Sequence, residues 1–237
     1  MAEHELLLAA QAGDLERTRA LCQQGTDASA AAEGGVTPLL LAAQGGYTEV
    51  VHLLCDAKAE LQKATSDGAT PLLVACQYGH LDVARCLLDR GADKERPKAN
   101  GATPLYMAAM KGHLELVQLL CEAGANKDRA KRDGATALFA AAESGQLEVV
   151  RYLCEAGART QKATHLGGTP ALAAEEYGHT EVVEFLSSFR TAKEDVRPPC
   201  NAAVLGTLGL SVGLTLLFAL LTHWATQNLQ RQPRQEL

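Results

Sequence analysis

The sequence lacks the residue patterns that carry enzyme chemistry. It has no set of nucleophile, base and orienting residue, no glycine-rich phosphate loop after a strand, and no paired Cys motif. Its net charge is −6 and aromatic residues make up 4% of the chain. Both features argue against nucleic acid as a partner, because nucleic acids attract basic surfaces and stack on aromatic rings. We therefore expect no catalytic residues, no metal site and no cofactor.

Charge is absent from a long stretch near the C-terminal end. No charged residue occurs between Ala202 and Thr222, where Leu, Val, Ala, Gly and Phe dominate. A helix of about 20 residues crosses the hydrocarbon core of a bilayer, and Trp224 follows where an aromatic ring suits the membrane interface. The pattern predicts one transmembrane helix over residues 201–223 and a short polar tail over residues 224–237.

The alternative to a membrane span is a buried helix that caps the preceding domain. Such helices are shorter and keep a polar face, and Gly206, Gly209 and Gly213 would weaken one in water. In a bilayer, Gly209 and Gly213 form a small-xxx-small face that predicts pairing of two spans into a homodimer. Cys200 stands beside the span after two prolines and is a candidate lipidation site, because juxtamembrane cysteines are palmitoylated.

The position of the span predicts a tail anchor with a cytosolic N-terminal side. Residues 223–237 are too few to emerge from the ribosome before translation ends, so insertion would be post-translational. The N-terminal residues have no basic stretch or long apolar region, so we expect no secretory signal there. The last four residues, Arg234-Gln235-Glu236-Leu237, are similar to an endoplasmic-reticulum retrieval signal, which favours that membrane over a chance tetrapeptide.

The remainder of the chain repeats one unit. A threonine that starts a Thr-Pro-Leu motif, or a close variant of it, recurs every 33 residues, at Thr37, Thr70, Thr103, Thr136 and Thr169. Its hydroxyl predicts a helix start, and a proline next to it suits the first helical position. A glycine that predicts the helix end follows at Gly46, Gly79, Gly112, Gly145 and Gly178. A second helix with one apolar stripe comes next, so stacked units bury a shared core in a solenoid.

Two further positions of the unit are occupied by small residues. A pair that lets helix backbones approach closely stands at Ala42-Ala43, Ala75-Cys76, Ala108-Ala109, Ala141-Ala142 and Ala173-Ala174. One position of the second helix holds Cys22, Cys55, Cys121 and Cys154. Because Leu and Ser fill that position in other units, we interpret it as a small buried side chain in a reducing compartment, and not as a metal ligand.

These motifs, with Gly-His at Gly79-His80 and Gly112-His113, resemble the ankyrin-repeat family. The resemblance covers residues 1–190 as six repeats and implies an all-α solenoid of paired antiparallel helices with projecting hairpin turns. Residues 191–200 are then a linker. In the first repeat Arg17, Thr18 and Ala20 replace apolar residues, as the polar outer face of a terminal cap requires.

The chain departs from the family pattern at two positions. The usual histidine after Thr-Pro-Leu is replaced at Leu40, Leu73, Tyr106, Phe139 and Leu172, which predicts apolar packing in place of a buried hydrogen-bonding network. The acidic residue usual at the hairpin base is replaced at Ala32, Thr65, Lys98, Lys131 and Thr164. The second departure predicts looser or differently turned hairpins.

The resemblance implies a protein partner bound at the hairpin tips and at the exposed ends of the first helices. The matching positions are Ser66, Asp67, Gln77, Tyr78, Asn100, Met110, Lys111, Arg132, Asp133, Glu143, Ser144, His165, Glu176 and Tyr177. We expect the aromatic and flexible apolar side chains among them to contribute most binding energy. Basic residues also cluster in two adjacent hairpins, at Lys94, Arg96, Lys98, Lys127, Arg129, Lys131 and Arg132. They form either a site for an acidic peptide or a solvated edge.

The sequence therefore favours a non-enzymatic scaffold that displays its repeats on the cytosolic side of an internal membrane. Its C-terminal tail anchor would hold it there while the repeats recruit a protein partner. The alternative is a soluble adaptor, such as a substrate receptor of a ubiquitin ligase or an inhibitory subunit, whose apolar tail packs on a partner.

Overall fold

The computed structural model describes residues 1–195, with side-chain surroundings for residues 1–189, and its repeats form one compact unit, Met1–Thr191. The helices are α1 (Ala2–Ala12), α2 (Leu15–Gln23), α3 (Pro38–Gly45), α4 (Thr48–Asp56), α5 (Pro71–Tyr78), α6 (Leu81–Asp89), α7 (Pro104–Lys111), α8 (Leu114–Glu122), α9 (Ala137–Glu143), α10 (Leu147–Glu155), α11 (Pro170–Glu176) and α12 (Thr180–Asp195). A single 3₁₀ turn, η1 (Glu33–Gly35), precedes α3. The described residues contain no β-strand.

The predicted helix starts and ends are confirmed. The Thr37 hydroxyl accepts a hydrogen bond from the Leu40 amide at 3.2 Å, and the threonines of the later repeats do the same. This bond satisfies one of the amides that a helix N-terminus leaves without an intrahelical acceptor. Gly46 ends α3 with φ 73°. This left-handed conformation is unfavourable for any residue that carries a side chain. Each repeat is thus a short helix, a glycine turn and a second helix.

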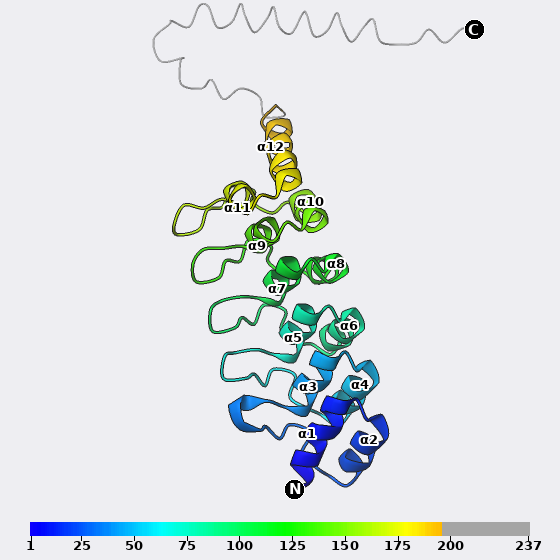
Figure 1. Ribbon diagram of the computed structural model, residues 1–237. Coiled ribbons are helices and arrows are strands. Elements are labelled where there is room, and N and C mark those ends of the chain that lie inside the picture. Colours follow the sequence, from blue (N-terminus) through cyan, green and yellow to red (C-terminus); the bar gives the residue numbers. More distant parts are fainter. Residues whose placement is uncertain (196–237) are drawn as a thin grey trace, which may run out of the picture. The chain divides into compact units, whose positions relative to one another are not determined.

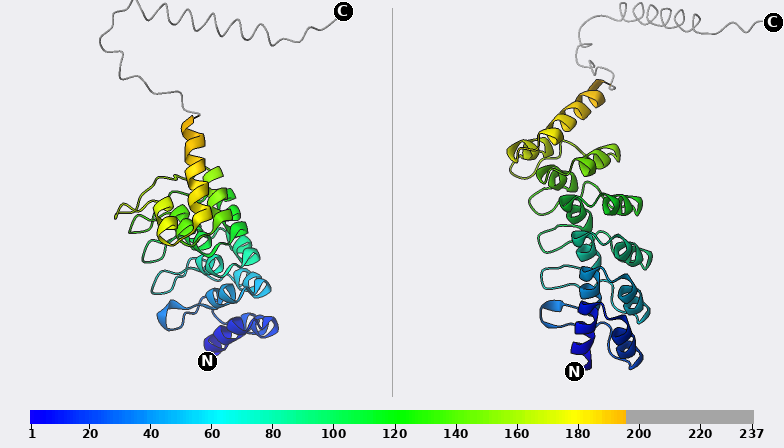
Figure 2. Two further views of the ribbon diagram at one scale, coloured as in Figure 1. Left: turned by 45° about the horizontal axis from the view of Figure 1, so that its top comes forward. Right: turned by 45° about the vertical axis from the view of Figure 1, so that its right-hand side comes forward.

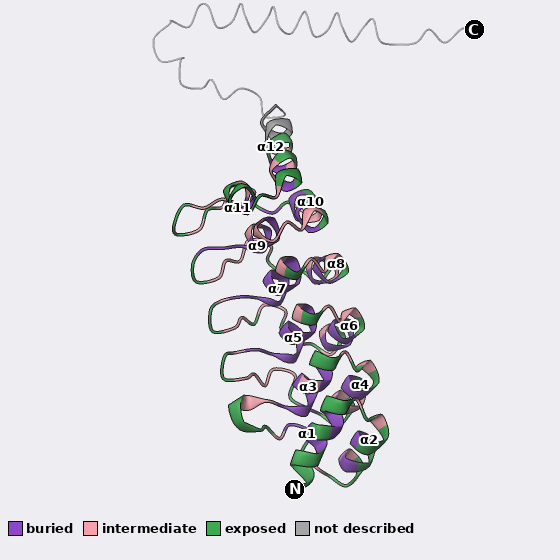
Figure 3. Ribbon diagram, viewed as in Figure 1, coloured by how far each residue is buried: buried purple, intermediate pink, exposed green. Residues whose placement is uncertain are grey.

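The helices stack in two rows (Figure 1). The odd-numbered helices form an inner row in which each helix packs against the next, and the even-numbered helices from α2 to α10 each pack against their inner partner and their outer neighbours. Figure 2 shows the same two rows from other directions, with the long loops projecting on the inner-row side. The core lies between the rows, where buried segments of the helices gather (Figure 3). It includes Leu39, Leu72, Leu105 and Leu138, which expose at most 2% of their surface.

The projecting loops are closed at the base by main-chain hydrogen bonds. The Lys98 amide donates to the Ala102 carbonyl at 2.9 Å, and equivalent bonds close the loops at Ala32, Thr65, Lys131 and Thr164. Neighbouring loops are also joined: the amides of Ser66, Ala99, Arg132 and His165 each donate to a carbonyl of the preceding loop tip. Main-chain bonds thus close the hairpins and join them without an acidic residue at the base, and the expectation that they are looser or differently turned than the family's stays a prediction.

The two ends of the array differ from its middle. At the first repeat Arg17 and Ala20 are exposed as predicted, but Thr18 is buried and its hydroxyl donates to the Asp14 carbonyl at 2.7 Å. At the last repeat, the 33-residue register aligns Ala174 and Glu175 with the small pair, so the predicted pair Ala173-Ala174 is displaced by one residue. Glu175 is exposed there because no further inner helix follows α11 in the described residues.

The predictions for the C-terminal end concern residues beyond this part of the chain. The span 201–223, the lipidation site Cys200, the pairing glycines Gly209 and Gly213 and the terminal tetrapeptide all lie outside the described residues. Within the described residues, no helix has the length and apolar character needed to cross a bilayer.

Candidate partner-binding surface

The loop tips are preorganised turns that present polar side chains. Asn100 and Asp133 each accept, through Oδ1, a hydrogen bond at 3.0 Å from the amide two residues later, and Asp67 makes a longer one of 3.4 Å. Each of these residues precedes a glycine with positive φ, as a turn of this kind requires. The predicted tip residues are all exposed: Ser66, Asp67, Asn100, Arg132, Asp133 and His165. Tip bonds between loops hold them in one row.

Two lysines beside this row are neutralised by tip carboxylates. Lys98 Nζ lies 2.8 Å from Asp67 of the preceding loop. The residue equivalent to Asp67 in the next loop is the uncharged Asn100, so Lys131 instead pairs with Asp133 of its own loop at 2.8 Å. Hydrogen bonds from Lys98 and Thr65 lower the pKa of Asp67 to about 2 from its usual 3.8.

The inner-helix ends continue the row toward the glycine turns. Tyr78, Lys111, Glu176 and Tyr177 are exposed, whereas Gln77, Met110, Glu143 and Ser144 are half-buried. The exposed fractions of Tyr78 and Tyr177 are 48% and 59%, which leaves ring surface available for a partner. Sequence reasoning missed Gln44, which holds the same register position in the second repeat, is exposed and donates to the Tyr78 hydroxyl at 3.5 Å. Extending the 33-residue register by one repeat identifies it.

Apolar side chains lie beneath this polar row. Leu40, Leu73 and Tyr106 expose at most 5% and form a second hydrophobic cluster with Val74 and Met107, against which Met110 packs. This confirms the predicted apolar packing for Leu40, Leu73 and Tyr106, and Phe139 packs against the same cluster, whereas the prediction does not hold for Leu172. Phe139 is half-buried and Leu172 is 53% exposed, so the column is open at its C-terminal end. Tyr106 also lies under Lys131, whose Nζ is 5.3 Å from the ring centroid.

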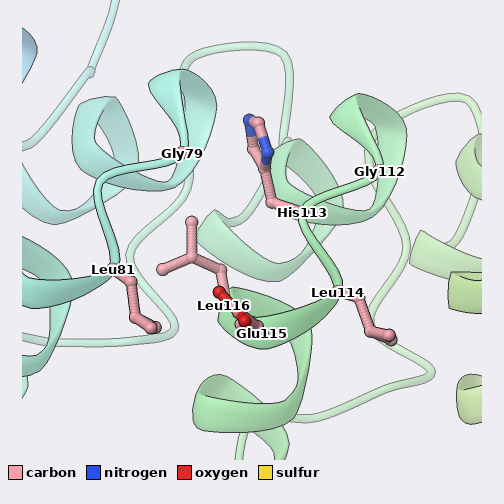
Figure 4. A pocket seen from close by; sticks show the side chains of 7 residues that line it. All are labelled: Gly79, Leu81, Gly112, His113, Leu114, Glu115 and Leu116. Carbon is pink, nitrogen blue, oxygen red and sulfur yellow. The ribbon is translucent and has the colours of Figure 1, made fainter.

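The Gly-His turns are packing sites. A Cβ atom placed on Gly79 would lie 2.7 Å from the His113 ring, and one on Gly46 would lie 2.5 Å from His80 Nδ1. Figure 4 shows His113 beside Gly79, with Leu116 below it. These three residues are among those that line a groove of about 340 Å³. His80 Nε2 donates to the Gln44 carbonyl at 2.9 Å. These rings hold one repeat to the next, a structural role that accounts for their position.

The loops following the outer helices are joined by a clamp that sequence reasoning missed. Glu95 accepts hydrogen bonds from the Asn126 amide at 2.7 Å and from Arg129 at 3.1 Å. Asp128 accepts in the same way from the Arg159 amide at 2.8 Å. Arg129, Lys98 and Lys131 are thus paired with carboxylates, so three of the seven residues of the predicted basic strip have their charge offset.

The cysteines and histidines that the structure describes hold no candidate metal site. Cys22, Cys55 and Cys121 are half-buried and Cys154 is buried, so the prediction of a small buried position holds fully only for Cys154. Burial raises the pKa of Cys55 to about 11, which keeps its thiol protonated at neutral pH. Among the described residues, no group of three or more His, Cys, Asp or Glu side chains is placed to hold a metal ion.

Comparison with known proteins agrees with this geometry. The family model for ankyrin repeats (three copies) matches residues 6–98 and 94–164, which together cover more than half of the chain. No curated protein matches the sequence. The repeat motif, the two rows of helices, the projecting loops and the family match agree, and the chain belongs to the ankyrin-repeat family.

Proposed function

We propose that this protein is a non-enzymatic scaffold that recruits a protein partner through the surface formed by its loop tips and inner-helix ends. The observation that carries the proposal is the register of this surface. One register position presents Tyr78, Lys111 and Tyr177 in different repeats, and a loop-tip position presents Asp67 and Asn100, so equivalent positions carry exposed side chains of different chemistry. A rigid frame with varied exposed residues suits selective protein binding, since aromatic side chains supply contact energy and charges supply selectivity.

In this proposal the scaffold is attached to a membrane. The uncharged run 201–223 anchors the chain as a single-pass tail anchor, so that the repeats face the cytosol and the last residues face the lumen. The endoplasmic reticulum is favoured by the terminal Arg234-Gln235-Glu236-Leu237. Palmitoylation of Cys200 and pairing through Gly209 and Gly213 would strengthen attachment and dimerise the scaffold.

Carbonate extraction tests the anchor. The full chain and a version ending at Pro199 are expressed in cells, each with a glycosylation acceptor at its C-terminus. We expect the full chain to pellet with membranes and become glycosylated, and the shorter version to be extracted. Pelleting without glycosylation would move the anchor to another membrane. Extraction of both forms would favour a soluble adaptor whose apolar tail packs on a partner.

Proximity labelling tests the binding surface separately. Tyr78→Asp and Tyr177→Asp are combined in the full chain, since both rings are exposed and their replacement leaves the core intact. We expect loss of the labelled partner from this variant. Glu155→Lys on the outer row, also exposed, serves as the control. Retention of the same partners by the double variant would place the binding surface elsewhere, whatever the extraction experiment shows.

A further inference from the structure

In every repeat except the last, a side chain of the next repeat covers the turn glycine. We call the space over this glycine the seat, and in the last repeat no described residue covers it. The turn glycines Gly13, Gly46, Gly79, Gly112 and Gly145 are each covered by a side chain of the next repeat, in order Tyr47, His80, His113, Gln146 and His179. Gly178 holds the same position in the last repeat, and no atom of the residues that the structure describes lies within 4 Å of a Cβ placed there. The acceptor beside the seat is also defined, because His80 and His179 bond to the carbonyls of Gln44 and Glu143, whose register equivalent is Glu176.

Apolar surface is exposed around the same seat. Val51, Ala84, Val117 and Val150 are fully buried in the preceding repeats, whereas Val183 at their position is half-buried. Leu172 exposes 53% at a position where Leu73 exposes none. These residues lose burial because the next pair of helices, which would cover them, is absent from the described array. The inter-repeat interface therefore continues onto the open end.

A groove of about 310 Å³ lies at this end between α11 and α12. It is lined by Glu175, Gly178, His179, Thr180, Val183 and Glu184. Residues 170–189 contain four glutamates and no lysine or arginine. Two of those glutamates, Glu175 and Glu184, border the groove and are exposed. The groove thus combines an apolar floor with an acidic rim, and its charge selects a basic occupant.

We propose that the open end of the array binds a basic helical segment of a second protein, which stacks on repeat six as a further repeat would. The segment places a histidine, glutamine or tyrosine side chain over Gly178, within reach of the Glu176 carbonyl. An equivalent contact between two earlier repeats shows where the basic residue of the bound segment would lie. Arg151, which is equivalent to Glu184, lies 4.7 Å from the Phe185 ring, 34 residues further on. The corresponding position in the occupant therefore faces Glu184.

Two occupants from this chain fit less well. Thirty-three residues after His179 the sequence has Val212, whose side chain cannot donate to a carbonyl, and the surrounding stretch from Pro198 to Gln230 has no lysine or arginine to pair with the glutamates. The N-terminal repeat of a second copy would present Asp14 at this position, which the acidic rim repels. The charge pattern thus favours a different protein.

A synthetic peptide provides the probe. It copies residues 103–122, which form repeat four and stack through His113 over Gly79, and it carries Leu119→Arg, Glu115→Lys and Glu122→Lys. Its binding to the full chain in phosphatidylcholine nanodiscs is measured by fluorescence anisotropy, with empty nanodiscs subtracted. We expect binding that weakens about tenfold when Glu175→Lys and Glu184→Lys are combined. The matched control, Glu122→Lys with Glu155→Lys, makes the same charge change on exposed outer-row residues and should leave binding unchanged.

Measurements on the unaltered protein give independent tests. Replacing the peptide's His113 by Ala should weaken binding about tenfold, and raising the salt concentration should weaken binding of the parent peptide. The proposal is overturned by equal binding to the rim variant and its control, or by no binding at about 1 mM peptide. Binding that appears only after removal of residues 200–237 would also overturn it, because the chain's own tail would then be the occupant.

Discussion

At the scale of single residues, the packing of a ring on a glycine is the most sharply testable contact. Gly46 has φ 73°, and a Cβ there would lie 2.5 Å from His80 Nδ1. In Gly46→Ala we expect about 1–2 kcal/mol of left-handed backbone strain and a further loss of about 1–3 kcal/mol from overpacking. Urea unfolding measures the sum of these two losses in the free energy of unfolding.

Gly25→Ala is the matched control for that substitution. Gly25 has φ 81°, but within the described part of the chain no atom lies within 4 Å of a Cβ placed on it, so only the backbone strain should remain. Combining His80→Ala with Gly46→Ala should recover part of the overpacking loss, because the ring is removed. Equal losses of stability at Gly46 and Gly25 would show that the ring contact is unimportant.

A second residue-scale prediction concerns acid. The pKa of Asp67 falls from 3.8 to about 2 because Lys98 and Thr65 bond to its carboxylate. A lowered folded-state pKa means that ionised Asp67 stabilises the fold above about pH 4 and that this contribution is lost as pH falls through about 2. NMR titration of the carboxyl group should give this low pKa, and Lys98→Ala should raise it. An unchanged pKa in Lys98→Ala would contradict the assigned cause.

At the scale of an element, the inner helices depend on their threonine caps to different degrees. Thr136 exposes 1% and accepts from the Phe139 amide, so Thr136→Ala leaves that amide without its acceptor. We expect a loss of about 1–2 kcal/mol in the free energy of unfolding. Thr169 is half-exposed and caps α11, where water can replace the hydroxyl, so Thr169→Ala should lose less. Equal losses in chemical denaturation would contradict this ranking.

The elements also show what sequence could and could not predict. Thr37, Gly46 and the apolar stripe of α4 act through local rules of capping, handedness and periodicity, so one repeat suffices to read them. The clamp at Glu95 joins residues 31 apart, and its equivalent in the first repeat is a serine, so no residue type marks it. The family resemblance implied the surface residues, but the pairing of Lys131 with its own loop depended on a neighbour, Asn100, being uncharged.

At the scale of the whole array, stability should decline toward the last repeat. Each repeat packs against its neighbours, so a terminal repeat has one interface where a central repeat has two. Ala171 replaces leucine in α11, and Leu172 is 53% exposed. Native-state hydrogen exchange should therefore show lower protection for α11 than for α7. Uniform protection across the array would indicate unfolding as one cooperative unit.

A core substitution provides a second test at this scale. Leu105 exposes 2% in the middle of the array, so Leu105→Ala should lower the free energy of unfolding by about 2–5 kcal/mol. Leu172→Ala, the same chemical change at the exposed end, should lower it by less than about 1 kcal/mol. Thermal and urea unfolding of the two variants compare them directly. Similar losses would mean that Leu172 is covered in the native protein.

The row of bonds between loop tips has a mechanical consequence. Each tip is joined to the preceding one by a main-chain bond, such as that from Ala99 to Asp67, while the helices behind are held by packing. Packed side chains tolerate small sliding, whereas a hydrogen bond weakens steeply when it is lengthened or tilted. Bending the array so that neighbouring loop tips move apart therefore requires more energy than bending it so that they move together. Under tension the array would therefore bend more easily in one direction than in the other. A partner that binds several loop tips at once would reduce this bending further.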